Sequence, residues 1–146
     1  MNANANLYEQ DFYAWTMQNA QLLRQGKLAE IDVEHIAEEL ESMGRSARRE
    51  LINRLAVLLA YLLKWQLQPP LRGKSWMVAI KEQRRAVTRC LKENPSLQSN
   101  LSGYFLEAYE DAVLETVKQT PFEEADLPVE CLFTLNQVLD GDFWPD

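Results

Sequence analysis

Hydrophobic residues are most concentrated between Leu51 and Trp65, where the sequence reads LINRLAVLLAYLLKW. Before Lys64 the only strongly polar residues in this stretch are Asn53 and Arg54, and there is no Gly or Pro. A helix that is apolar on all sides has to be enclosed by other helices or by lipid. Because Arg54 and Lys64 leave too short an uncharged run to cross a bilayer, the pattern predicts a central helix buried in protein.

Apolar residues at helical spacing predict two helices before this central one. The first is expected at 11–25, followed by Gly26 in the position that favours a left-handed residue. The second is expected at 33–43, with Asp32 as its cap and a hydrophobic contact across its start. Whether it continues through Gly44 stays open, because Gly inside a helix costs only about 1 kcal/mol relative to Ala.

The expected helix at 33–43 carries three arcs of side chains. At about 100° per residue, one arc is apolar and predicted to be core, one is acidic, and the third holds His35 with Glu39. The apolar arc consists of Val33, Ile36, Ala37, Leu40 and Met43, and the acidic arc of Glu34, Glu38 and Glu41.

Three more helices are expected after the central one, which the consecutive prolines at 69–70 end. Ser75 is expected to cap a helix that reaches Glu93. The next is expected at 94–118, with a cap and a proline in its first turn, and a short last helix at 129–139.

These elements predict an all-α protein, a compact bundle of five or six helices around the buried central helix. A length of 146 residues favours a single domain, 1–146. The polar N-terminus MNANANLYEQDF is unlike a secretion signal, so a cytoplasmic location is expected. Cys90 and Cys131 form no C-x-x-C pair, and we interpret both as small buried apolar residues. No cofactor is expected.

The charges are segregated along this acidic chain. The net charge of −7 argues against nonspecific binding of nucleic acid by the chain as a whole. Residues 67–95 hold seven Lys and Arg against two acids, which gives +5, whereas residues 96–146 hold one Lys against eleven acids, which gives −10. Either a basic helix packs beside an acidic one, or the basic segment is a docking face.

A docking face would use the outer basic stripe of the helix at 75–93 or the aromatic C-terminal tail. Basic residues recur there at spacings of three and four, and two large aromatics follow the last helix. The expected partner-binding residues are Lys81, Arg84, Arg85, Arg89, Phe143 and Trp144. The partner would be an unknown protein or a second copy of the chain in a homo-oligomer, and nucleic-acid contact through Arg84, Arg85 and Arg89 is the less favoured alternative.

A metal site is the weaker alternative, with Glu38, Glu41 and His35 as its candidates. Mg²⁺ takes one or two carboxylates, and Glu38-x-x-Glu41 resembles half of the pattern of all-α nucleotide pyrophosphohydrolases. The second half is missing at comparable spacing, and a single His excludes a di-iron bundle. His35 as a general base lacks a Ser, Cys or Asp at a recognisable partner spacing. We therefore expect no metal and assign no catalytic residue.

Seven short motifs in order resemble a bacterial family known as domain of unknown function twenty-nine. They are DFYAW at 11–15, EELESMGRSARREL at 38–51, LLKWQ at 62–66, SW at 75–76, QRR at 83–85, PSL at 95–97 and DFWP at 142–145. The resemblance implies a small, all-helical, cytoplasmic protein of the kind abundant in cyanobacteria, and it brings no activity.

Two positions depart from that family pattern. Tyr61 stands where relatives often have His, and Leu132 follows Cys131 where they often have Pro. The first departure removes a possible second histidine and weakens the metal interpretation. The sequence therefore favours a binding or regulatory module that acts through protein contacts, with Mg²⁺-dependent phosphoryl hydrolysis by Glu38 and Glu41 as the enzymatic alternative.

Overall fold

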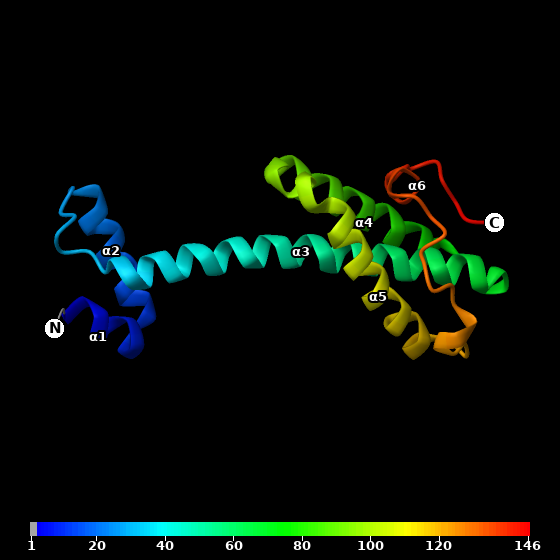
Figure 1. Ribbon diagram of the computed structural model, residues 1–146, viewed down its shortest axis with the longest axis horizontal. Helices are drawn as coiled ribbons and strands as arrows, with labels where there is room; N and C mark the ends of the chain where they lie inside the picture. Colours follow the sequence, from blue (N-terminus) through cyan, green and yellow to red (C-terminus); the bar gives the residue numbers. More distant parts are fainter. Residues whose placement is uncertain (1–2) are drawn as a thin grey trace. The chain divides into compact units, whose positions relative to one another are not determined.

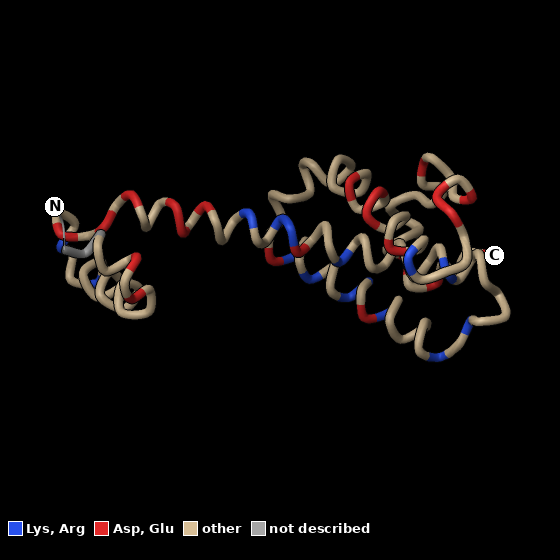
Figure 2. The backbone as a smooth tube through the Cα atoms, turned by 90° about the horizontal axis from the view of Figure 1, so that it is seen from below, with Lys and Arg blue, Asp and Glu red and all other residues tan. Residues whose placement is uncertain are grey.

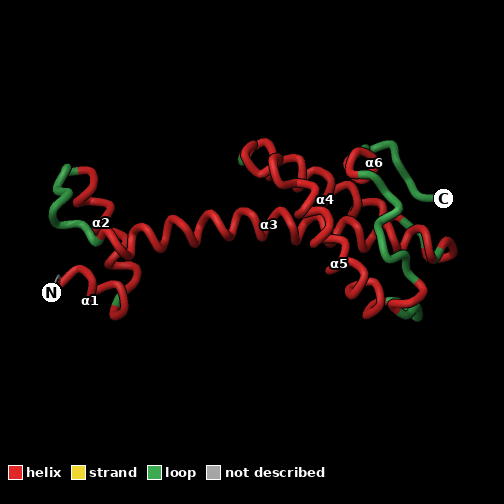
Figure 3. Tube along the Cα trace, viewed as in Figure 1, coloured by secondary structure: helices red, strands yellow, loops and turns green. Residues whose placement is uncertain are grey.

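The computed structural model describes residues 3–146, with side chains from Asn6 onward, and this part is all-α with no strand (Figure 1, Figure 3). The predicted fold class is confirmed. The six α-helices of this part are α1 (Ala3–Gln10), α2 (Phe12–Arg24), α3 (Val33–Leu67), α4 (Lys74–Glu93), α5 (Leu101–Gln119) and α6 (Leu135–Leu139). Three short 3-10 helices join them: η1 (Pro69–Leu71), η2 (Pro95–Asn100) and η3 (Glu124–Asp126). Within residues 3–146, no helix has both the length and the apolar character needed to cross a bilayer.

The chain divides into two compact units, the first ending at Ser46 and the second comprising Ala47–Asp146. Helix α3 contributes residues to both. The expectation of a single domain over 1–146 stays a prediction.

The second unit is built around the part of α3 that the sequence predicts to be buried. Five leucines of this part are fully buried, and they pack with buried residues of α4, α5 and α6. The leucines are Leu51, Leu55, Leu58, Leu59 and Leu62, and their partners include Ile80, Val87, Ala108, Ala112 and Val138. The central buried helix is therefore confirmed. This part of α3 is apolar on all sides because other helices enclose it.

Helix α3 joins the two helices that the sequence left either separate or continuous. It runs through Gly44 without interruption, and the Glu41 carboxylate lies 3.9 Å from the Arg45 guanidinium one turn later. It ends at Leu67, just before Pro69 begins η1.

Helix α4 begins slightly earlier than predicted and α5 begins later. Gly73 occupies the N-cap position of α4, so the assignment of Ser75 as the cap is wrong. Pro95 starts the 3-10 helix η2, and α5 itself starts only at Leu101. Proline fits the first turn of either helix type, which is why it cannot tell the two apart.

The last helix is shorter than the predicted 129–139. Helix α6 begins at Leu135, because Thr134 forms a capping box in which its hydroxyl accepts from the Gln137 N–H and its own N–H donates to the Gln137 side chain. Leu132, inside the predicted range, lies outside the helix and is exposed. The prediction followed the apolar spacing and overlooked the capping box.

The first unit differs from its prediction on α3. Helix α2 begins at Phe12, one residue after the predicted start, and Gly26 follows with a φ of +71°, as predicted; the Asp11 carboxylate caps the helix by accepting from the Ala14 N–H. Helix α1 was not predicted. The apolar arc of 33–43 was predicted to be core, but Val33, Leu40 and Met43 are 59%, 62% and 66% exposed. The unit instead packs around the neighbouring arc of α3, which holds His35 and Glu39.

Candidate functional site

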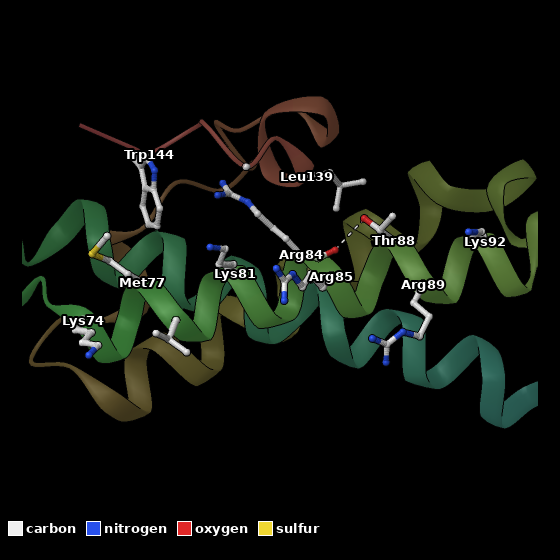
Figure 4. Close-up of a pocket in the computed structure, with 12 residues that line it drawn as sticks. Lys74, Met77, Lys81, Arg84, Arg85, Thr88, Arg89, Lys92, Leu139 and Trp144 are labelled. Carbon is white, nitrogen blue, oxygen red and sulfur yellow. Dashed lines mark hydrogen bonds between the residues drawn. The ribbon is translucent and has the colours of Figure 1, made fainter.

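A groove of about 800 Å³ runs along α4 beneath the C-terminal segment (Figure 4). Its lining contains six basic residues and no acid: Lys74, Lys81, Arg84, Arg85, Arg89 and Lys92. Apolar atoms come from Met77, Val78, Leu139 and Trp144. The groove therefore combines positive charge with an apolar surface in one place.

The spacing of residues along α4 explains why they share a face. Positions 74, 78, 81, 85, 88 and 92 follow one another at alternating intervals of four and three, so their side chains lie along one side of the helix. The opposite stripe at 80, 84, 87 and 91 is buried. Helix α4 is thus amphipathic, with the groove on its outer face.

Arg84 lies on the buried stripe and holds the C-terminal segment in place. It is only 6% exposed; its Nε donates to the Val138 carbonyl over 2.8 Å and its Nη2 to the Phe143 carbonyl over 2.6 Å. Burial lowers the pKa of this guanidinium, and the Asp140 carboxylate partly offsets that effect. Arg84 was expected on the outer, solvent-facing surface of the helix. It lines the groove, but as a buried residue of the inner wall.

The tail that Arg84 holds forms the far wall of the groove. The Trp144 ring lies 4.7 Å from the Trp65 ring, centroid to centroid, and the Arg84 guanidinium lies 5.5 Å from its centroid. Arg72 donates to the Pro145 carbonyl over 3.3 Å. Phe143 instead packs edge-on against Phe133 within the core. Five of the six residues predicted to bind a partner therefore line the groove, and Phe143 supports the wall from behind.

The bases on the outer face of α4 have no carboxylate partner. Within the described part of the second unit, salt bridges join Glu50 to Arg54 and Glu115 to Lys118, each pair within one helix. None involves α4. In the described residues, no acidic helix neutralises the basic residues of α4. The groove therefore keeps its positive potential.

The sequence missed the apolar half of the groove. Met77 and Val78 lie beside the lysines on the outer face of α4, and Leu139 comes from α6. The signal for the first two was present, because they follow the same spacing of three and four as the bases. Leu139 belongs to a different helix, α6, and only the fold brings it to the groove.

The weak metal candidates of the first unit are not gathered into one site. Among the described residues, no three His, Cys, Asp or Glu side chains lie close enough together to hold a metal ion. Glu38 is exposed and Glu41 lies near Arg45. His35 does have an acidic partner, contrary to the interpretation from spacing, because its Nδ1 lies 2.6 Å from the Asp32 carboxylate.

Asp32 and His35 belong to a polar cluster at the centre of the first unit. The Asp32 carboxylate accepts from the Trp15 indole N–H over 2.9 Å, and the Asp32 N–H donates to the Asn19 side chain over 3.0 Å. Burial alone would raise the pKa of Asp32, but the hydrogen bonds with His35 and Trp15 outweigh it, so the pKa lies below its usual value.

Tyr8 completes this cluster. Its ring stacks on His35 with centroids 3.9 Å apart, and its hydroxyl donates to the Glu39 carboxylate, which raises the pKa of Tyr8 to about 12. Each group is thus held by another side chain. The cluster fits a structural role.

Lys64 and Cys90 are buried, whereas Cys131, which the sequence analysis also interprets as buried, is only half-buried. The Lys64 Nζ donates to the Gln119 side chain over 2.6 Å and lies 4.0 Å from the centre of the Tyr61 ring; burial lowers its pKa, partly offset by Glu115. Burial raises the pKa of both thiols, Cys90 and Cys131, which disfavours the thiolate form of each.

The fold and the groove define a small all-α protein whose main candidate site is a basic cleft along one helix. The family model described as Domain of unknown function DUF29 matches residues 7–144, and the chain belongs to that family, as its motifs predicted. Comparison with curated proteins and with solved structures gives no match.

Proposed function

We propose that this protein is a binding module whose α4 groove holds an acidic segment of another protein. The observation that carries the proposal is the set of unpaired bases around an apolar floor. Besides the buried Arg84, the groove is lined by Lys74, Lys81, Arg85, Arg89 and Lys92, all exposed and without a carboxylate partner.

Charge and apolar surface would contribute differently to such binding. Unpaired Lys and Arg at the rim attract an acidic partner and speed its approach. Burial of Met77, Val78 and Leu139 would supply the favourable free energy, at roughly 25 cal/mol per Å² of apolar surface removed from water. Lys74 and Lys92 are eighteen residues apart, a rise of about 27 Å along α4, which suits a partner helix of about five turns.

A nucleic acid fits the groove less well. Single strands bind where aromatic rings are free to stack on bases. The aromatic residue of this groove, Trp144, already faces Trp65 and Arg84. Hydrolysis at Glu38 and Glu41 has less support again, since Glu41 lies beside Arg45 rather than beside another acid.

Fluorescence anisotropy with a labelled helical peptide, acidic on one face and leucine-rich on the other, tests the proposal. The double variant R85E/R89E should weaken binding at least tenfold. The matched double variant R54E/K118E changes the same charge on exposed residues outside the groove and should change affinity little. A peptide with its leucines replaced by serine should also bind more weakly.

Two results would contradict the proposal. Equal losses in both double variants would show that net charge alone attracts the peptide. Tighter binding of a single-stranded oligonucleotide than of the peptide, lost in R85E/R89E, would assign the groove to nucleic acid.

A further inference from the structure

An apolar stripe is exposed on the first half of α3, away from the groove. Val33, Leu40 and Met43 are each more than half exposed, and the small Ala37 lies between them. Intervals of four and three from Val33 through Ala37 and Leu40 continue to Gly44 and Ala47. This is the repeat with which one helix packs along another over several turns. Exposed apolar surface of this kind marks an interaction site.

The charges beside this stripe change sign along the helix. Glu34, Glu38 and Glu41 come first, and Arg45, Arg48 and Arg49 follow. Figure 2 shows the change as red along the first part of α3 and blue directly after it. A helix with this order is complementary to a second copy of itself that runs in the opposite direction.

We infer that α3 pairs antiparallel with α3 of a second copy of this chain, through the exposed stripe. A two-fold axis near position 42 would set Leu40 of each copy against Gly44 of the other and Ala37 against Ala47. The same register would bring Glu34 near Arg48 of the second copy and Glu38 near Arg45. A parallel pair would instead set Glu34, Glu38 and Glu41 each beside its own counterpart, which is unfavourable, whereas the antiparallel register does so only for Glu41.

Gly44 has a clear role in this arrangement. A Cβ added to it would meet no atom within 4 Å in the single chain, so the glycine is not required by packing within the chain. It lies in the middle of a helix, where Gly costs about 1 kcal/mol relative to Ala. In the proposed pair, the missing side chain of Gly44 leaves room for Leu40 of the second copy. The contact is the same on both copies, which is the usual symmetry of a dimer.

Sedimentation and light scattering across a range of concentrations test the pairing. The wild-type chain should form a dimer, and L40D should weaken it at least tenfold. The matched variant L106D, at another exposed leucine, on α5, should remain as dimeric as the wild type. A monomer at all concentrations, or a dimer that L40D leaves intact, overturns the inference.

Charge exchange tests the complementarity directly. E34K/E38K and R45E/R48E should each lower self-association, whereas an equimolar mixture of the two should form a heterodimer. Circular dichroism on each variant checks that the helices remain folded. A mixture that stays monomeric while both variants are folded overturns the inference.

Pulsed electron paramagnetic resonance tests the direction of the two helices. Spin labels would be attached at S42C or R54C in a chain whose Cys90 and Cys131 are replaced by Ala. An antiparallel pair centred on position 42 adds about 36 Å between the two labels at position 54 relative to position 42. Equal distances at the two positions would indicate a parallel pair and overturn the inference. The pairing does not depend on peptide binding at α4, so one of the two proposals can be overturned while the other stands.

Discussion

The cores of the two units differ in composition: the first is mainly polar and the second mainly apolar. In the described part of the first unit, Trp15 is the one buried hydrophobic residue, and it is surrounded by the polar groups of Asn19, Asp32 and His35. The second unit has a continuous cluster of buried leucines and other apolar residues. Hydrogen bonds require a defined direction between donor and acceptor, whereas apolar packing requires side chains that fill the available volume. The structure of the first unit therefore depends mainly on hydrogen-bond geometry, and that of the second unit mainly on the packing of its apolar side chains.

Helix α3 shows the contrast within one element. Both of its halves carry apolar residues at helical spacing, yet Leu40 is exposed and Leu58 is fully buried. The second unit surrounds its part of α3 with α4, α5 and α6, whereas α2 packs against a polar arc of the other part. Apolar periodicity thus marks a surface that can be buried, and the neighbouring helices decide whether it is.

The largest expected effect is in the leucine core. Leu58→Ala removes a fully buried side chain and leaves a cavity, so the free energy of unfolding of the second unit should fall by about 2–5 kcal/mol. Leu106→Ala, at an exposed position on α5, should change it by less than about 0.5 kcal/mol. Urea unfolding measures both. Similar losses in the two variants would contradict the assigned core.

A smaller, local effect is expected in the polar core. Asn19 accepts from the Asp32 N–H and donates to the Trp15 carbonyl, so Asn19→Ala leaves buried polar groups unpaired and should cost about 1–3 kcal/mol. Hydrogen exchange should show lost protection in α2 and the start of α3, with α4 and α5 unchanged; Gln18→Ala, on the exposed side of α2, is the control. Equal loss of protection in α4 and α5 would show that the two units unfold together.

The smallest expected effects concern two glycines and have opposite signs. Gly26 has a φ of +71°, where a Cβ is strained, so Gly26→Ala should destabilise the first unit by roughly 1 kcal/mol. In the single chain Gly44 lies within α3 with open space around it, so in the monomeric L40D background Gly44→Ala should stabilise the helix there by up to about 1 kcal/mol. Hydrogen exchange of nearby amides measures both. Two effects of the same sign would contradict the backbone geometry assigned to one of them.

The candidate site was predictable to the extent that it lies on one helix. Lys81, Arg85 and Arg89 share a face of α4 by spacing alone, and the structure places all three in the groove. The burial of Arg84 was not predictable, because its partners, the carbonyls of Val138 and Phe143, lie more than fifty residues away in the sequence. Nothing local distinguishes an arginine that will be buried by such partners from one that stays in water.

The sequence by itself determined the features that depend on neighbouring residues. It determined the all-α class, the start of α2 near Asp11, the left-handed Gly26 and the apolar part of α3, since caps, φ preference and periodicity are local properties. Tertiary structure alone decided which apolar stripe of α3 is covered, that Asn19 is buried and accepts from the Asp32 N–H, and that the tail forms one wall of the groove. Those outcomes depend on groups that are distant in the chain and close in space.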